Sequence, residues 1–129
     1  SALKALNPAI KVWGVEPDTA APTARSLAKG SPQVFEGWQA SFVDGAGGRS
    51  VFPRMWERMK PVLDGCIVVS LEETRQAMRL LAEKSRVIAE GAGALSVAAA
   101  LTGKAGPGPI VAIVSGGNVD LQKFCDLIG

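Results

Sequence analysis

The sequence contains no histidine, and this absence excludes several classes of enzyme. A Ser-His-Asp triad needs an imidazole as its base, and catalytic zinc sites most often use histidine ligands. The chain has only two cysteines, too few for a disulfide framework. Cys66 lies in an apolar run typical of a strand, and Cys125 lies in an apolar run typical of a helix. We therefore expect two buried, reduced thiols in a cytoplasmic protein.

Long apolar runs and an excess of one charge are also missing. No run approaches the roughly 20 residues of a membrane-spanning helix, and no basic and apolar signal peptide is recognisable. The net charge is only +2, from 14 Lys and Arg against 12 Asp and Glu. The one dense basic stretch contains Arg54, Arg58 and Lys60 and is interrupted by Glu57, which is typical of a solvated helix face. We expect no membrane and no nucleic-acid partner.

The residues that are present alternate between helical and strand patterns over 1–129, which we take as one domain. Strands are expected at 11–16, 66–69 and 110–114, because these runs are apolar and rich in β-branched residues. Ser70 and Glu73 form a capping-box pattern at the start of one helix. Helices are expected at 1–6, 23–29, 54–60, 71–84 and 91–101, and in the segment that begins at 119. This alternation predicts an α/β fold, a three-layer parallel sheet with helices on both faces.

The most informative stretch is 111–118, where an apolar run ends in a polar turn with two glycines. Ligands of α/β sheets bind where a strand's carboxyl end meets such a turn. Glycines let the backbone come close to a ligand, and the hydroxyl of Ser115 can point at it. The alternative is a plain strand-to-helix connection, in which Ser115 caps the last helix through the amide of Asn118.

Four segments carry a resemblance to one family of enzymes. Residues 114–121 (VSGGNVDL) resemble the C-terminal signature of the serine/threonine dehydratases. These are pyridoxal-phosphate (PLP) enzymes of the tryptophan-synthase-β fold, also called fold type II, and serine racemase is a relative. Further segments resemble the family in the family's order and extend the similarity over nearly the whole chain: 12–17 (VWGVEP), 42–45 (FVDG) and 87–94 (VIAEGAGA).

The resemblance implies a cofactor, a site and a reaction. The cofactor is pyridoxal phosphate, and its contacts are Ser115, Gly116, Gly45 and Glu90, with Ser115 facing the ring nitrogen. A serine hydroxyl does not protonate pyridine as a carboxylate partner does, so the ring is a weaker electron sink. That favours a lyase reaction, in which L-serine or L-threonine loses water and yields a 2-oxo acid and ammonia.

Two parts of the family pattern are missing from this chain. None of its seven lysines stands in the S-x-K-x-R-G context of the Schiff-base lysine, and there is no tetraglycine loop for the cofactor phosphate. We therefore expect a C-terminal part of the large domain, without the N-terminal half and without a catalytic residue of its own. Such a chain would be inactive alone, would not hold the cofactor stably, and would associate with itself or with the missing half.

Several alternatives stay open. Glu90 could be a helix-start residue only, and Gly91 and Gly93 are expected to serve packing. Serine racemase relatives bind a divalent cation through residues that match Glu16, the carbonyl of Ala20 and the position of Pro22. Proline offers no such oxygen, so we expect no metal, and the alternative is a turn in which Glu16 accepts backbone hydrogen bonds.

Two other functions compete with the lyase fragment. The chain could be a stand-alone truncated α/β domain that acts as a self-association or interaction module. It could also be an unrelated small α/β binding protein.

Overall fold

Two parallel strands form the centre of the molecule in a computed structural model that describes residues 2–129. Strand β1 (Trp13–Pro17) pairs with β2 (Gly65–Val69), with Trp13 opposite Gly65 and Pro17 opposite Val69. Both strands carry the predicted apolar, β-branched runs. Their carboxyl ends meet at the same edge of the sheet, where ligands of α/β proteins bind.

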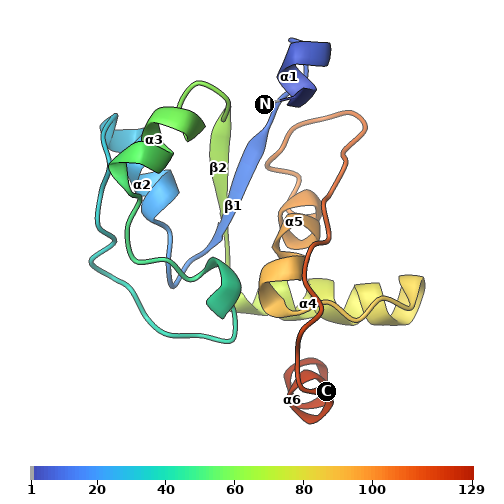
Figure 1. The fold of residues 1–129 in the computed structure, drawn as a ribbon. Helices are drawn as coiled ribbons and strands as arrows, with labels where there is room; N and C mark the ends of the chain where they lie inside the picture. The colour runs from blue at the N-terminus through green and yellow to red at the C-terminus, as the bar shows by residue number, and fades with distance from the viewer. Residues whose placement is uncertain (1) are drawn as a thin grey trace.

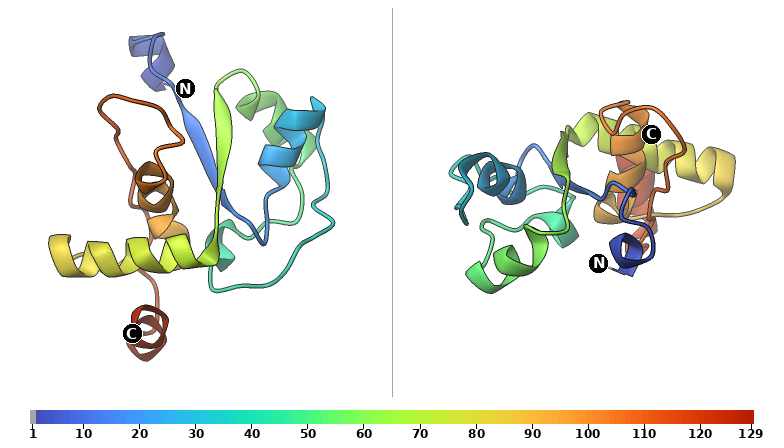
Figure 2. Two further views of the ribbon diagram at one scale, coloured as in Figure 1. Left: turned by 180° about the vertical axis from the view of Figure 1, so that it is seen from behind. Right: turned by 90° about the horizontal axis from the view of Figure 1, so that it is seen from above.

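Helices cover both faces of this sheet, as the alternating pattern predicts (Figures 1 and 2). On one side lie α2 (Pro22–Lys29) and α3 (Pro53–Met59). On the other side lie α4 (Leu71–Leu80), which continues into a π-helical turn at Leu81–Ser85, and α5 (Gly91–Leu101). Helix α6 (Leu121–Ile128) packs on α4, and α1 (Ala2–Leu6) lies at the amino end of β1. A short 3-10 turn covers Asp44–Ala46. The predicted first helix is thus present, except that Ser1 lies outside the described residues.

Local residues determine where two of these helices begin and end. Pro22 stands in the first turn of α2, and Gly30 ends the helix at a φ of 74°, a left-handed conformation that glycine adopts at little cost. The capping box of α4 is confirmed. The Glu73 amide donates to Ser70 Oγ at 3.1 Å, and the Ser70 amide donates to Glu73 Oε2 at 2.7 Å.

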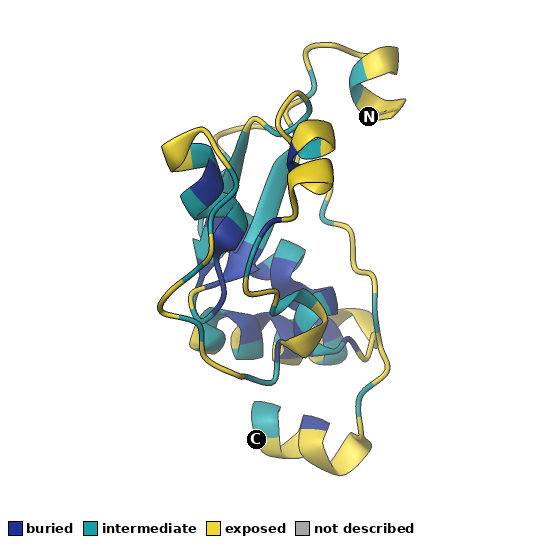
Figure 3. Cartoon of the chain, turned by 60° about the vertical axis from the view of Figure 1, so that its left-hand side comes forward, coloured by how far each residue is buried: buried dark blue, intermediate teal, exposed yellow. Residues whose placement is uncertain are grey.

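The core lies between the sheet and the α4–α5 pair (Figure 3). Small side chains on α5 allow its backbone to approach α4 and β2 closely, and Phe124 joins the core from α6. The buried members include Ile67, Val69, Ala77, Met78, Ala94, Leu95, Ala98 and Ala99. None of the helices within residues 2–129 is long and apolar enough to cross a membrane.

Two predictions about the C-terminal third are wrong. Residues 110–114 form no strand, because no neighbouring strand within residues 2–129 offers them a hydrogen-bonding edge. Val111 and Ile113 are therefore 85% and 68% exposed. Cys125 is also exposed, because α6 places Phe124 and not Cys125 in the core, whereas Cys66 is half-buried as a strand residue. The last helix begins at Leu121, two residues later than expected.

Candidate functional site

Three of the four predicted cofactor residues lie together at the start of α5. A Cβ atom placed on Gly45 would lie 3.0 Å from the Ala92 Cβ and 3.6 Å from Glu90 Oε1. A Cβ placed on Gly116 would lie 2.7 Å from the Glu90 Cδ and still closer to Oε1. The 3-10 turn, the first turn of α5 and the turn after 114 therefore meet around the Glu90 carboxylate. We call Gly45, Glu90, Ser115 and Gly116 the glycine cluster.

Glu90 occupies the N-cap position of α5, but its side chain does not cap the helix. The residue is extended, with φ −69° and ψ 169°, and its side chain makes no capping hydrogen bond. Its backbone amide donates instead to the carbonyl of Gly116 at 3.0 Å. The carboxylate thus remains in the positive field of the helix N-terminus, beside the two glycines of the cluster. Helix capping does not explain why a glutamate stands here.

Gly91 and Gly93 serve packing, as expected. A Cβ on Gly91 would lie 2.8 Å from the Phe42 Cδ2 and 3.0 Å from the Phe42 carbonyl oxygen. A Cβ on Gly93 would lie 2.8 Å from the Gly116 nitrogen and 3.1 Å from its carbonyl carbon. Gly91 thus allows the segment at Phe42 to contact the first turn of α5, and Gly93 allows the segment at Gly116 to contact the same turn.

Ser115 is exposed, and its hydroxyl makes no hydrogen bond to any residue between 2 and 129. The alternative in which Ser115 caps the last helix is wrong. Asp120 caps α6, because its Oδ1 accepts from the amide of Lys123 at 2.9 Å. The predicted contact between Ser115 and a ring nitrogen stays a prediction.

Glu16 accepts backbone hydrogen bonds, as expected if this segment is a turn. Its Oε1 accepts from the amide of Thr23 at 2.8 Å, and its Oε2 accepts from the amide of Ala24 at 2.9 Å. Both carboxylate oxygens are thereby used at the N-terminus of α2. Ala20 is fully buried beside this turn. No three His, Cys, Asp or Glu side chains gather into a possible metal site anywhere in the described chain.

A thiol joins this carboxylate, and the sequence analysis missed it. The Cys66 Sγ donates to Glu16 Oε2 at 3.5 Å across the paired strands. Burial raises the pKa of the Cys66 thiol, and the negative charge of Glu16 raises it further. The register of the two strands places Cys66 opposite Gly14 and so brings it close to Glu16. A local sequence pattern does not predict how two strands are aligned, so the pair could not be found from the sequence.

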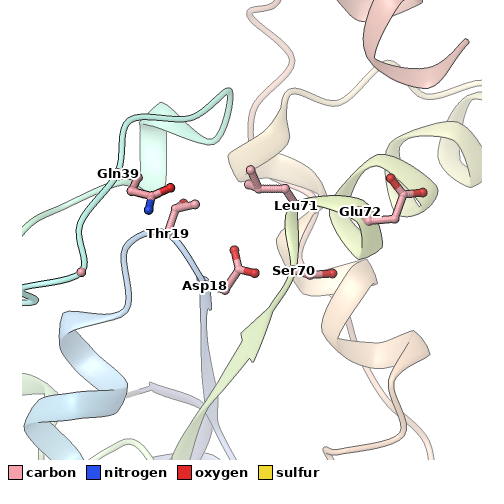
Figure 4. A pocket seen from close by; sticks show the side chains of 7 residues that line it. Asp18, Thr19, Gln39, Ser70, Leu71 and Glu72 are labelled. Atoms are coloured by element: carbon pink, nitrogen blue, oxygen red, sulfur yellow. The ribbon is translucent and has the colours of Figure 1, made fainter.

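A separate polar hollow of about 420 Å³ lies at the carboxyl ends of the two strands (Figure 4). Asp18 follows β1 and Ser70 follows β2, so the sheet places both at this edge. The other side chains labelled in Figure 4 come from the loop after α2 and from α4 and the turn after β1: Thr19, Gln39, Leu71 and Glu72. No member of the glycine cluster lines this hollow.

Known proteins with similar sequences are threonine-degrading enzymes. The chain is 37% identical to the L-threonine ammonia-lyase of Thermotoga maritima over 128 residues, which are 98% of this chain and 32% of that protein. It is 35% identical to the catabolic L-threonine dehydratase TdcB of Staphylococcus aureus, covering 99% of this chain and 38% of the relative. The chain thus spans about a third of the length of these curated relatives.

Similar solved structures include a threonine deaminase and a serine racemase. The T.th. threonine deaminase superposes with a TM-score of 0.87 at 36% identity, covering 93% of this chain and 41% of that one. The serine racemase of maize superposes with a TM-score of 0.85 at 31% identity, covering 97% and 41%. These likenesses confirm the fold-type-II class, of which this chain is a partial domain.

A family model fits residues 1–116, most of the chain and including the turn at Gly116. That match, together with the superpositions, identifies the chain as a member of the family of pyridoxal-phosphate dependent enzymes.

Proposed function

We propose that this chain is the C-terminal part of the large domain of a PLP-dependent ammonia-lyase. The substrate of the complete enzyme is L-threonine or L-serine, and the products are a 2-oxo acid and ammonia. The printed names of the relatives support the reaction class. The observation that carries the proposal is the meeting of Gly45, Glu90 and the Ser115–Gly116 turn in one place.

The residues of the glycine cluster fit a flat aromatic cofactor. Three backbone segments converge there, and Gly45 and Gly116 place no side chain against the Glu90 carboxylate between them. The polar groups that remain are the Glu90 carboxylate and the exposed hydroxyl of Ser115, which has no partner within residues 2–129. A bound pyridoxal phosphate supplies an electron sink for a carbanion at the substrate's Cα.

Ser115 would hold the ring of a bound cofactor by donating one neutral hydrogen bond to the ring nitrogen. An alcohol is too weak an acid to leave its proton on a pyridine nitrogen, whereas a carboxylate partner keeps that nitrogen protonated. A serine at this position would therefore leave the cofactor a moderate electron sink, which would favour loss of the β-hydroxyl over slower side reactions at Cα. Gly116 keeps the backbone beside Ser115 free of a side chain.

The covalent lysine and the phosphate loop would then belong to an N-terminal part of a cytoplasmic enzyme. Neither pattern occurs in this sequence, so we propose that the chain alone neither holds the cofactor stably nor turns over. An alternative is a self-association module, which the exposed Val111 and Ile113 favour. Activity reconstituted with an N-terminal half discriminates between the two. A tetraglycine loop or an S-x-K-x-R-G segment encoded immediately upstream of the Ser1 codon would exclude an unrelated small α/β binding protein.

The test uses the complete enzyme and changes Ser115. We expect Ser115→Ala to lower turnover roughly ten- to a hundredfold, because the lost hydrogen bond acts where charge develops in the transition state. The thermal midpoint should change little, since one neutral hydrogen bond contributes about 1 kcal/mol, and the absorbance of the bound cofactor should shift. Ser115→Asp should move product from the 2-oxo acid towards racemisation or transamination.

The matched control is Ser85→Ala, which removes an exposed hydroxyl that is not part of the glycine cluster. It should leave turnover and spectrum at wild-type values. The role of Ser115 is wrong if Ser115→Ala alters stability alone. The reaction class is wrong if the complete enzyme releases no 2-oxo acid from either hydroxy amino acid.

A further inference from the structure

We propose that Gly93 is a positioning residue that sets the orientation of Ser115 through the peptide of Gly116. That the orientation of Ser115 matters for a cofactor rests on the proposed function. That Gly93 holds the Ser115–Gly116 turn in place rests only on geometry within this chain.

The backbone of the Ser115–Gly116 turn lies directly against the first turn of α5. A Cβ on Gly93 would lie 2.8 Å from the Gly116 nitrogen, 3.1 Å from its carbonyl carbon and nearest of all to its carbonyl oxygen. Real Cβ atoms essentially never approach a heavy atom within 3.0 Å. All three neighbours are backbone atoms, which cannot rotate away as the end of a side chain does. Any side chain at position 93 therefore displaces the turn or the helix.

Two further contacts hold the turn in this place. The amide of Glu90 donates to the Gly116 carbonyl at 3.0 Å. A Cβ on Gly117 would lie 2.8 Å from the carbonyl oxygen of Ile88, so the next residue is pressed against the segment that precedes α5. The turn is thus fixed on two sides, and the absence of a side chain at Gly93 makes its contact with α5 possible.

Ser115 shares a peptide bond with Gly116, so its hydroxyl moves when that peptide moves. A hydrogen bond tolerates only a few tenths of an ångström and a limited angle, and misplacements of about 1 Å at an active site carry large rate penalties. Gly93 acts on the site in this indirect way, since it carries no side chain that could touch a ligand.

Gly91 provides the matched control in the same helical turn. A methyl group there meets Phe42 and not Gly116. The variants Gly93→Ala and Gly91→Ala therefore insert the same group into one helical turn, against different neighbours. A general loss of packing affects both variants, whereas a displaced turn is specific to Gly93→Ala.

The first measurement is amide hydrogen exchange in this chain, followed residue by residue. In the wild type the Glu90 amide should be protected, because it donates to Gly116. In Gly93→Ala we expect it to exchange roughly tenfold faster or more, as loss of about one hydrogen bond implies. The buried amides of Ala77 and Met78 in α4 should keep their protection, and Gly91→Ala should keep that of Glu90.

Equal effects of the two variants would overturn the proposal, and so would an unprotected Glu90 amide in the wild type. The wild-type measurement needs no variant, so an unprotected Glu90 amide overturns the proposal even if Gly93→Ala does not fold.

The second measurement separates this inference from the proposed function. In the complete enzyme, Gly93→Ala should shift the absorbance of bound pyridoxal phosphate in the same direction as Ser115→Ala, and Gly91→Ala should not. If Ser115→Ala shifts the spectrum and a folded Gly93→Ala does not, the positioning role is overturned. If neither shifts it while Glu90 exchange responds as expected, Gly93 positions the turn and the cofactor role of Ser115 is wrong.

Discussion

Glu16 shows how one buried side chain serves two elements at once. Its carboxylate accepts from the amides of Thr23 and Ala24 and also from the thiol of Cys66. The residue is only 8% exposed, and its charge is compensated by amides at the positive end of α2. The same charge acts against ionisation of Cys66, so the two residues are chemically linked although 50 positions separate them.

The two cysteines should therefore differ sharply in reactivity. Alkylation needs the thiolate, and burial and Glu16 raise the pKa of Cys66, so this thiol stays protonated through neutral and mildly alkaline pH. Cys125 is exposed on α6. At about pH 8 we expect iodoacetamide to modify Cys125 fully while Cys66 stays unmodified. Peptide mass mapping measures this, with Cys125→Ser as the control that should abolish labelling of the folded chain.

Equal labelling of both thiols in the folded chain would show that Cys66 is not shielded. Both should react in urea, because unfolding removes the burial and the contact with Glu16 that suppress the thiolate of Cys66.

Two reciprocal hydrogen bonds cap the start of helix α4, and they stabilise the helix as a whole. Ser70 and Glu73 satisfy each other's backbone amides, and Thr74 adds a hydrogen bond from its hydroxyl to the Ser70 carbonyl at 2.9 Å. The hydrogen bond from the Ser70 amide lowers the pKa of Glu73 below its usual 4.5. The cap therefore carries a pH dependence.

We expect Ser70→Ala to lower the free energy of unfolding by about 1 kcal/mol. The contribution of Glu73 is fully present above its unfolded pKa, near 4.5, and is lost as pH falls towards the lower folded value. Glu73→Gln should therefore reduce stability at neutral pH and flatten its decline between neutral and acidic pH. Urea unfolding at a series of pH values measures both effects.

Glu72→Gln is the control for that experiment. Glu72 is exposed, and its partners among residues 2–129 are Arg75 and Gln76 on the surface, so its effect should be small. An acid dependence that is the same in wild type and in Glu73→Gln would contradict the cap's role.

Elements that depend on neighbouring residues were predictable, and those that depend on distant partners were not. Pro22 with Gly30, and Ser70 with Glu73, mark helix ends through contacts within a few residues. Residues 110–114 have the composition of a strand, but a strand also needs an edge to pair with, and composition does not say whether one is available. The exposure of Cys125 likewise depends on what packs over α6.

Part of the candidate site could likewise be predicted from the sequence, and the part that depends on distant partners could not. The resemblance named Gly45, Glu90, Ser115 and Gly116, and the structure brings three of them into contact distance around one carboxylate. The Glu16–Cys66 pair and the polar hollow at the strand ends depend on register and were missed.

At the scale of the whole molecule, an apolar segment is left uncovered. Residues 110–114 run along α5, tied to it by the hydrogen bond from Ser96 Oγ to the Ile113 carbonyl at 2.6 Å. Val111 and Ile113 point away from the core, with most of their surface exposed. Exposed apolar surface of this kind marks interaction sites or drives aggregation.

We expect this chain alone to form dimers or larger species at micromolar concentration. Sedimentation velocity over a dilution series measures the distribution. The double variant Val111→Lys with Ile113→Lys should shift it towards monomer, because two charges replace the exposed apolar groups. Leu101→Lys is the control, since it places a charge on an exposed apolar residue of α5 outside this segment. A compact monomer at every concentration would contradict the expectation.

The order of the glycine cluster along the chain has a consequence for synthesis on the ribosome. Gly45 emerges first, Glu90 follows much later, and the turn at Ser115 comes close to the end of the sequence. Residues leave the exit tunnel in sequence order, so Gly45 and Glu90 are outside the ribosome before Ser115 and Gly116. The glycine cluster therefore cannot assemble before the turn at Ser115 has emerged, however early β1 and β2 are exposed.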